Sequence, residues 1–468
     1  MDTPPSVAKR CTSLNAFPPS LKDSVCYSPS VSVRQSMLRV GVFCVAGVAA
    51  GVALGRFLSR RHAILRLRLQ LAAASFTLKN VRVPCGLLPL SAIGRLTADE
   101  EGLVHCDVTV ADGKIADVGP AENKSAGVDC GGCVLVACWT DAHTHMVKTH
   151  THPRARNPTG SINDALATEV DDQPRWLSCA CCGPVTFGAG SPPPGPPPAE
   201  NDVERRMEFA AASAYHHGTR ALRTHLDGTN SPDPKLRAAV YAAFDACRAR
   251  WAAKGMHMQG VANLYLPLWT NRALAEQHVA EAVRHEGVLL GAYCGNVNGT
   301  PVHETAAAFD ALFGYAQAHG LQVDLHIDET NDPGCCALMP LVDALTRARA
   351  GGYAHPVLLG HCTSLTLQSD ATKAAVIRGL AALDAVSVVC NPMTNLGLQD
   401  RRGSAAPHCS PIDADVPRTP LWRGLTLVQE LAAANVIVGA ASDNVSRASA
   451  AFARRKPCVQ PTAQDGEP

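Results

Sequence analysis

The sequence predicts an α/β fold class, a (β/α)8 TIM barrel with a small β-sandwich domain formed by the N-terminal strands. Eight short apolar runs recur along the chain, and each run ends in polar residues. Segments with helical periodicity separate the runs, so strands and helices alternate as parallel βαβ units require. Short alternating strands precede the first run. In a barrel of this class, the active site lies at the carboxyl ends of the strands.

The N-terminal region has the composition of a targeting or disordered segment. Residues 1–38 contain eight serines and only Asp2 and Asp23 as acids. Residues 40–55 carry no charge and are followed by Arg56. We therefore predict that residues 39–58 form an apolar segment, either a transmembrane anchor or part of a cleaved presequence. The expected location is accordingly an organelle or a membrane surface.

Residues 76–137 are predicted to form the small β-domain. The segments "FTLKNVRV" and "LVHCDVTVADGKIADVG" alternate in polarity, and Asp112-Gly113 is a hairpin signal between two strands. Residues 138–450 are predicted to form the barrel. Its strands are expected in the runs "GCVLVACWTDAHTH", "TRALRTHLD", "MHMQGVANLY", "GVLLGAYCGN", "LQVDLHIDET", "PVLLGHCTS", "AVSVVCNPMTN" and "NVIVGAASDN".

Two Pro/Gly-rich stretches interrupt this alternation, at residues 188–202 and 402–417. Neither can hold a regular element, so we expect exposed loops there. Residues 451–468 are predicted to be a disordered tail.

The overall composition favours small substrates. The formal net charge is +1, and we find no basic stripe interleaved with aromatic residues, so no nucleic-acid partner is expected. The 19 cysteines are an odd number scattered through apolar runs, which is typical of free thiols in a reducing compartment.

Residues capable of chemistry fall at four predicted strand ends. The first strand ends in His143 and His145, the fifth in His326, Asp328 and Glu329, the sixth in His361, and the eighth in Ser442, Asp443 and Asn444. Such a coincidence is more specific than any single histidine.

The tripeptide His-Thr-His occurs twice, at residues 143–145 and 150–152. The apolar run from Cys133 to Cys138 ends just before Asp141, so the first pair is expected at the strand end, pointing into the barrel mouth. We expect His150 to line the pocket and His152 to be a loop residue.

Imidazoles together with one carboxylate suit one divalent metal ion, zinc or ferrous iron. Three or four protein ligands leave a position for water, whose pKa the ion lowers. Asp443 can bind the metal and accept the water proton, and Glu329 can carry a proton to the leaving nitrogen. His361 can polarise the carbonyl or orient the water. This assembly predicts a metal-assisted hydrolase of C–N bonds.

The motifs "DAHTHMVKTHTHPRA", "LHIDETNDP", "LLGHCTS", "NPMTNLGLQDR" and "ASDN" resemble, in order, those of the cytosine deaminase-like branch of the amidohydrolase superfamily. The resemblance implies a single metal held by His143, His145, His326 and Asp443. It implies that Glu329 is the proton shuttle and that His361 lies at the activated water. The expected reaction is deamination of a cytosine-like heterocyclic amine. Candidate substrate-binding residues are Lys148, His150, His225, Asp227, Asn395 and Gln399.

The sequence departs from the family at two places. Close relatives have Leu-Asp where this chain has Met146 and Val147. After "ASDN" the family continues with a last barrel helix and with strands that complete the β-domain, whereas the sequence here continues "VSRASAAFARRKPCVQPTAQDGEP". We therefore expect a truncated or divergent member, with an eighth strand that lacks most of its covering helix.

Two alternatives remain open. One is a cyclic amidase that opens rings, but such enzymes usually bridge two metals with a lysine after strand four, where "LLGAYCGN" has none. The other is a non-catalytic, membrane-tethered barrel. Oligomers are common among such barrels, but no interface stands out in the sequence.

Overall fold

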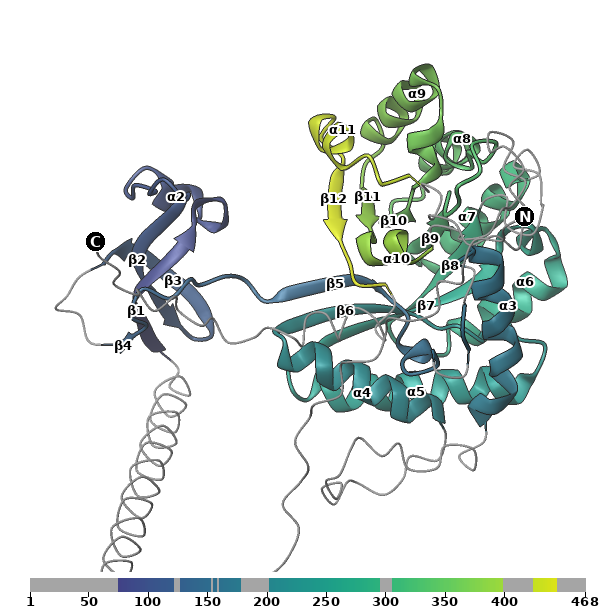
Figure 1. Cartoon of the computed structure of the whole chain (residues 1–468), viewed down its shortest axis with the longest axis horizontal. Helices are drawn as coiled ribbons and strands as arrows, with labels where there is room; N and C mark the ends of the chain where they lie inside the picture. Colours follow the sequence, from purple (N-terminus) through teal and green to yellow (C-terminus); the bar gives the residue numbers. More distant parts are fainter. Residues whose placement is uncertain are drawn as a thin grey trace, which may run out of the picture. The chain divides into compact units, whose positions relative to one another are not determined.

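The computed structural model describes residues 75–121, 127–152, 155–157, 160–177, 202–294, 305–398 and 424–443 (Figure 1). The chain divides into two compact units, with the boundary between Ala137 and Cys138. Within the described residues, no helix combines the length and apolar character needed to span a bilayer. Several predicted segments lie outside the described residues, namely 1–38, 39–58, 188–201, 402–417 and 451–468.

The first unit contains one four-stranded sheet in the order β3-β2-β1-β4. Its strands are β1 (Ser75–Pro84), β2 (Leu103–Ala111), β3 (Lys114–Pro120) and β4 (Val128–Asp129), with the short helices η1 (Cys85–Leu87) and α2 (Leu90–Ile93). Asp112 and Gly113 join β2 to β3 at φ values of 51° and 73°. Two positive φ values are what a two-residue hairpin turn requires. The predicted small β-domain is confirmed.

The second unit is a barrel of eight parallel strands in sequential order, β5 to β12. The strands are β5 (Trp139–Thr144), β6 (Thr219–His225), β7 (His257–Tyr265), β8 (Val288–Cys294), β9 (Val323–Ile327), β10 (Val357–His361), β11 (Val386–Cys390) and β12 (Ile437–Ala440). A parallel bridge between Thr144 and Asp443 brings the two end strands together. The predicted (β/α)8 barrel is therefore confirmed, and each predicted run contains one strand.

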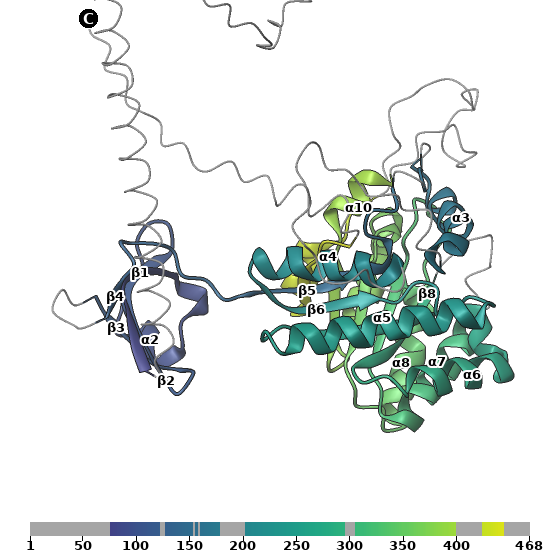
Figure 2. The same cartoon turned by 90° about the horizontal axis from the view of Figure 1, so that it is seen from below.

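Helices cover the barrel and fill the loops after its strands. They are α3 (Ile162–Asp172), α4 (Asp202–His216), α5 (Pro234–Ala252), α6 (Arg272–Ala282), α7 (Thr305–His319), α8 (Leu338–Ala350), α9 (Asp370–Ala381), α10 (Pro392–Gly397) and α11 (Val428–Ala433), with the 3-10 turns η2 (Met146–Lys148), η3 (Gln173–Leu177), η5 (Leu266–Thr270) and η8 (Ser364–Leu367). Local signals set their ends. Asp233, for example, caps α5 by accepting a hydrogen bond from the Lys235 amide at 2.9 Å, and Pro234 follows it. Helices α4 and α5 pack together outside β6 and β7 (Figure 2).

The first barrel strand begins later than the apolar run suggested. It starts at Trp139, whereas Val134 pairs with Arg82 in the first unit. An apolar run has the same pattern whether it belongs to the small sheet or to the barrel. Periodicity therefore could not show which sheet the residues before Trp139 join. At the other end of the barrel, Ile437 on β12 is 71% exposed. Residues after Asp443, where the sequence predicted a missing cover, lie outside the described residues.

Candidate metal centre

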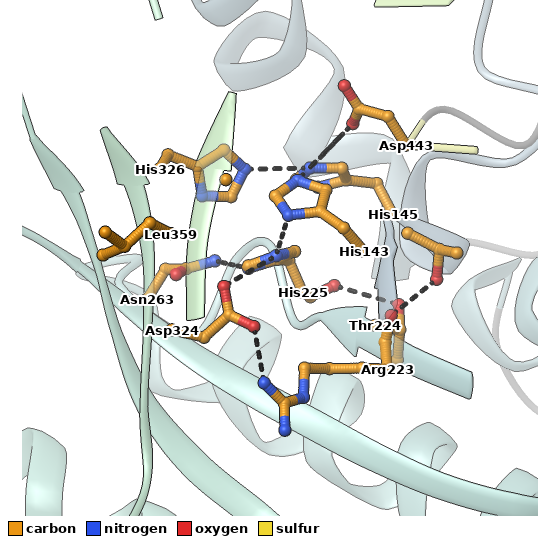
Figure 3. A network of polar contacts seen from close by, with 12 residues as sticks. His143, His145, Arg223, Thr224, His225, Asn263, Asp324, His326, Leu359 and Asp443 are labelled. Atoms are coloured by element: carbon orange, nitrogen blue, oxygen red, sulfur yellow. Dashed lines mark hydrogen bonds and ion pairs between the residues drawn. The ribbon is translucent and has the colours of Figure 1, made fainter. Parts of the chain in front are cut away.

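Three strand ends bring a cluster of buried imidazoles and one carboxylate together (Figure 3). His143 lies at the end of β5 and His145 directly follows that strand. His326 lies on β9, and Asp443 comes three residues after β12. All four side chains are buried. The sequence predicted these residues as metal ligands, and the fold places them side by side.

Donor atoms of these residues lie close together, and those of His143, His145 and His326 lie within 4.8 Å of one another, with one of His225. His145 Nε2 lies 3.0 Å from His326 Nε2 and 3.2 Å from Asp443 Oδ1, and His143 Nε2 lies 3.8 Å from the same oxygen. Atoms bound to one tetrahedral ion at about 2.0–2.1 Å lie roughly 3.3 Å from one another. The spacing therefore fits a single divalent ion.

The protonation states also fit a metal site. Burial lowers the pKa of His143 and that of His326 well below their ordinary values, so both rings are neutral, as metal ligands must be. His143 Nε2 is buried and makes no hydrogen bond within the described residues. Burial opposes the charge on Asp443, but the neighbouring imidazoles outweigh it and lower its pKa. His143 and His326 therefore offer unprotonated nitrogens, and Asp443 offers an anionic oxygen.

Asp227 sets the orientation of His145. Its Oδ2 lies 2.7 Å from His145 Nδ1, which leaves Nε2 facing the cluster. Burial opposes protonation of His145, but the Asp227 carboxylate outweighs it and raises the pKa of His145 to about 9. An ion that binds at Nε2 must therefore displace a proton from this ring.

Strand β5 holds Asp443 through its backbone. The Asp443 amide donates to the His143 carbonyl at 2.8 Å, and the Asp443 carbonyl accepts from the His145 amide at 2.9 Å. Asp443 has a φ of 59°, and His361 has one of 69°. Left-handed backbone at residues other than glycine costs energy and clusters at functional sites.

Glu329 and His361 lie beside the cluster. Glu329 Oε2 is 3.5 Å from His361 Nε2, and the ligand atoms of His326, Glu329 and His361 lie within 4.8 Å of one another. The side chain of Asn391 approaches His361 Nε2 at 3.3 Å, and Thr426 Oγ1 donates to the His361 carbonyl at 2.6 Å. Both predicted catalytic residues are thus next to the proposed ligands.

Lys148 belongs to a buried charged network that the sequence did not predict in full. Its Nζ lies 2.9 Å from Glu169 Oε2 and 3.4 Å from Asp227 Oδ1, and Tyr293 donates to the same Asp227 oxygen at 2.6 Å. Burial opposes the charge on Lys148, but the two carboxylates outweigh it and raise its pKa. Burial also raises the pKa of Glu169 despite its lysine partner. Glu169, on α3, was missed because nothing in the local pattern marks it.

A cavity of about 180 Å³ opens beside the cluster, and His145, His326, Glu329 and Asp443 form one wall. Lys148 and Glu169 also line it, and its apolar lining includes Leu166, Trp176, Met393 and Leu398. The sequence predicted that His150 would line the pocket, but the structure reverses the two histidines. His152 lines the cavity, whereas the exposed His150 packs on Phe209 with ring centroids 4.2 Å apart.

The other predicted substrate-binding residues lie elsewhere. His225, Asp227 and Asn395 are buried and do not line the cavity among the described residues. Asp227 holds His145 instead, and Asn395 lies on α10 beside the lining residue Thr394. Gln399 lies outside the described residues.

His225 lies behind His143, and its neighbours Arg223 and Asp324 were also missed. The alternation of strand side chains could have found them, because Arg223 shares a strand face with His225, and Asp324 with His326.

A comparison of the sequence with known proteins identifies one relative. No protein-family model matches the chain. It is 35% identical over 376 residues to the pterin deaminase of Rhizobium rhizogenes, a match that covers 80% of this chain and 74% of that protein.

Solved structures show the same fold at lower identity. A 5-methylcytosine deaminase from Klebsiella pneumoniae liganded with phosphonocytosine matches with a TM-score of 0.56 and 21% identity, over 79% of this chain and 75% of that chain. N-isopropylammelide isopropylaminohydrolase from Burkholderia multivorans matches with a TM-score of 0.50 and 21% identity, over 80% and 76%. Together with the pterin deaminase match, these findings confirm the predicted resemblance: the chain belongs to the amidohydrolase superfamily, as a metal-dependent hydrolase of C–N bonds in the group of deaminases that includes pterin deaminase.

Proposed function

We propose that this enzyme removes the amino group of a 2-aminopyrimidin-4-one ring fused to a second ring, as in pterin. The observation that carries the proposal is the 35% identity to a pterin deaminase over 80% of the chain. The sequence favoured a cytosine-like heterocycle. A fused aminopyrimidinone also carries an amino group on a ring carbon next to a ring nitrogen, but it has two rings instead of one.

We further propose that His143, His145, His326 and Asp443 hold one divalent ion, zinc or ferrous iron. The convergence of their donor atoms and the neutral state of two rings support this assignment. When bound, the ion would supply Lewis acidity and make water a nucleophile near neutral pH.

In this proposal, water adds to the ring carbon that bears the amine, and Asp443 accepts the water proton. Glu329 lines the cavity, so it can donate its proton to the adjacent ring nitrogen. The proton that Asp443 accepted from water then passes to the leaving amine, and the proton of the added hydroxyl returns to Glu329 as the carbonyl forms. Ammonia leaves and a carbonyl remains. His361, 3.5 Å from Glu329, keeps that carboxyl near the reacting carbon.

The lining of the cavity suits a flat heteroaromatic ring. Trp176, Leu166 and Met393 offer apolar surface. The Lys148–Glu169 ion pair also lines the cavity and offers charged groups that can hydrogen-bond to the carbonyl and amide groups of a ring. No lysine is present after β8 in "LLGAYCGN", which disfavours the two-metal cyclic amidase.

The test is ammonia release by the full-length protein loaded with zinc or with ferrous iron. Pterin, cytosine, guanine and hydantoin are compared, with His326→Ala as the control. We expect pterin to give the highest kcat/KM, a product in which oxygen replaces the amino group, and no reaction in the control. A metal-loaded protein that deaminates none of the amines, or that opens hydantoin instead, would overturn the proposal.

A further inference from the structure

The barrel interior beneath the cluster is polar. Barrels of this class usually fill that space with branched apolar side chains. Here His225, Asn263 and Asp324 are almost fully buried, and Arg223 donates to Asp324 at 3.0 Å (Figure 3). Burying such groups costs free energy unless each is satisfied, so a polar interior calls for a specific role.

The two nitrogens of His143 face different partners. Nε2 faces Asp443, whereas Nδ1 lies 3.1 Å from His225 Nε2. A ring that binds a metal through Nε2 must carry its proton on Nδ1. His143 Nδ1–H therefore donates to His225 Nε2, and His225 accepts with that nitrogen.

This assignment fixes the state of His225 as well. With Nε2 accepting, its proton lies on Nδ1, which lies 2.9 Å from the amide nitrogen Nδ2 of Asn263. Two donors would then face each other, so this assignment requires a half-turn of the Asn263 amide that exchanges its nitrogen and oxygen. Asn263 Oδ1 makes no hydrogen bond in the described part of the chain, and after the half-turn it accepts from His225 Nδ1–H.

Two glycines leave space for the buried polar layer formed by His143, His225 and Asn263. A Cβ on Gly360 would lie 2.8 Å from His143 Cε1, and a Cβ on Gly291 would lie 2.4 Å from the position that Asn263 Oδ1 occupies before the half-turn. Real Cβ atoms do not approach so closely, so any larger residue would displace the ring or the amide.

We propose that His225 and Asn263 are positioning residues that hold His143 in the tautomer whose unprotonated Nε2 faces the metal position. The inference rests on the proposed metal site. A donor atom of His225 lies within 4.8 Å of donor atoms of His143, His145 and His326. In this proposal His225 nevertheless acts through His143, because its Nε2 faces His143 Nδ1. Asp324, 3.7 Å from His225 Nε2 and held by Arg223, completes the layer.

The test measures metal affinity of the full-length apoprotein by competition with a chelating dye. His225→Phe and Asn263→Leu keep the side-chain bulk but remove the acceptors, and His257→Phe, on the first residue of β7, is the control. We expect both test variants to bind one ion per chain about 10–100-fold more weakly, and the control to bind like the wild type. Folded variants within twofold of the wild type would overturn the proposal.

A second measurement needs no substitution and stands if the variants fail to fold. In zinc-loaded protein labelled with ¹⁵N-histidine, His143 and His225 should both carry their proton on Nδ1. A proton on Nε2 of His225 would contradict the inference. If the wild-type protein binds no metal, the proposed function itself fails, whereas normal metal binding by the variants removes only the positioning role.

Discussion

At the scale of single residues, the proposed proton carrier is the most direct point of test. Glu329→Gln keeps the shape and polarity of a side chain that lines the cavity, but it removes the transferable proton. We expect kcat for the amine substrate to fall about 10²–10⁴-fold, since that is the usual contribution of general acid–base catalysis. Metal content and KM should change little. Steady-state kinetics with metal analysis measure both, and a variant with near wild-type kcat would exclude Glu329 as the proton carrier.

Lys148 is predicted to be a structural requirement of the buried network. Lys148→Met leaves the Glu169 and Asp227 carboxylates without their shared cation in a largely buried site. We expect the free energy of unfolding to fall by about 3–5 kcal/mol, because removal of one partner strands buried charge. Chemical denaturation measures the change.

The control for this prediction is the double variant Lys148→Met/Glu169→Gln, which removes the stranded charge and should recover most of the loss. Lys373→Met breaks a pair whose Asp370 partner is fully exposed, and it should leave stability near that of the wild type. Equal effects of the single and double variants would show that packing, not charge, is responsible.

At the scale of elements, the contact between β5 and the end of β12 is predicted to control the position of Asp443. Asp141 accepts from the Ser442 hydroxyl at 2.5 Å and from the Ser442 amide at 3.1 Å. Asp141→Ala removes both hydrogen bonds, so the free energy of local opening should fall by about 1–3 kcal/mol. Hydrogen exchange at the Asp443 amide measures this. Ser442→Ala removes only one bond and should have a smaller effect; unchanged exchange in both would contradict the prediction.

Helix α6 is attached to β7 through His278, which sets a pH dependence. The buried His278 Nε2–H donates to the Ala262 carbonyl at 3.2 Å, and burial lowers the pKa of His278 below 6.5. Because the unfolded chain binds this proton more readily, the stabilising contribution is full above about pH 6.5 and falls as the pH decreases.

We therefore expect His278→Gln to lose less stability than the wild type between pH 7.5 and pH 5.5, by up to about 1.4 kcal/mol. Chemical denaturation at the two pH values measures the change in unfolding free energy of each protein. The contributions of the other histidines are the same in both proteins and cancel in the comparison. Parallel pH profiles for the two proteins would count against a neutral buried His278.

At the scale of the whole molecule, metal binding should stabilise one unit only. All proposed ligands lie after Ala137, as do all five tryptophans. Free metal at 100 times Kd should therefore add about 2.7 kcal/mol to the unfolding free energy that tryptophan fluorescence reports. Hydrogen exchange in β1, β2 and β3 should not change. A shift of both units together would mean that they unfold cooperatively.

Much of the fold and of the candidate ligand set could be predicted from the sequence. Apolar runs and helical segments are local signals, and the strand-end rule then narrows the candidates to four strand ends. The family resemblance implies His143, His145, His326 and Asp443 among them. The start of β5 was misplaced by a few residues, because an apolar run does not say which sheet it joins. The exchange of His150 and His152 at the cavity has a similar origin, since loop geometry has no periodic signal.

The sequence by itself determined the barrel, the strand ends that carry chemistry, and the reaction class. Only the tertiary structure decided which side chains hold those groups in place. His225 and His143 are 82 residues apart, and Asp443 reaches His145 only when β12 meets β5. Such contacts depend on barrel closure and on the direction of each ring, which no local pattern encodes, because they arise from packing between distant strands.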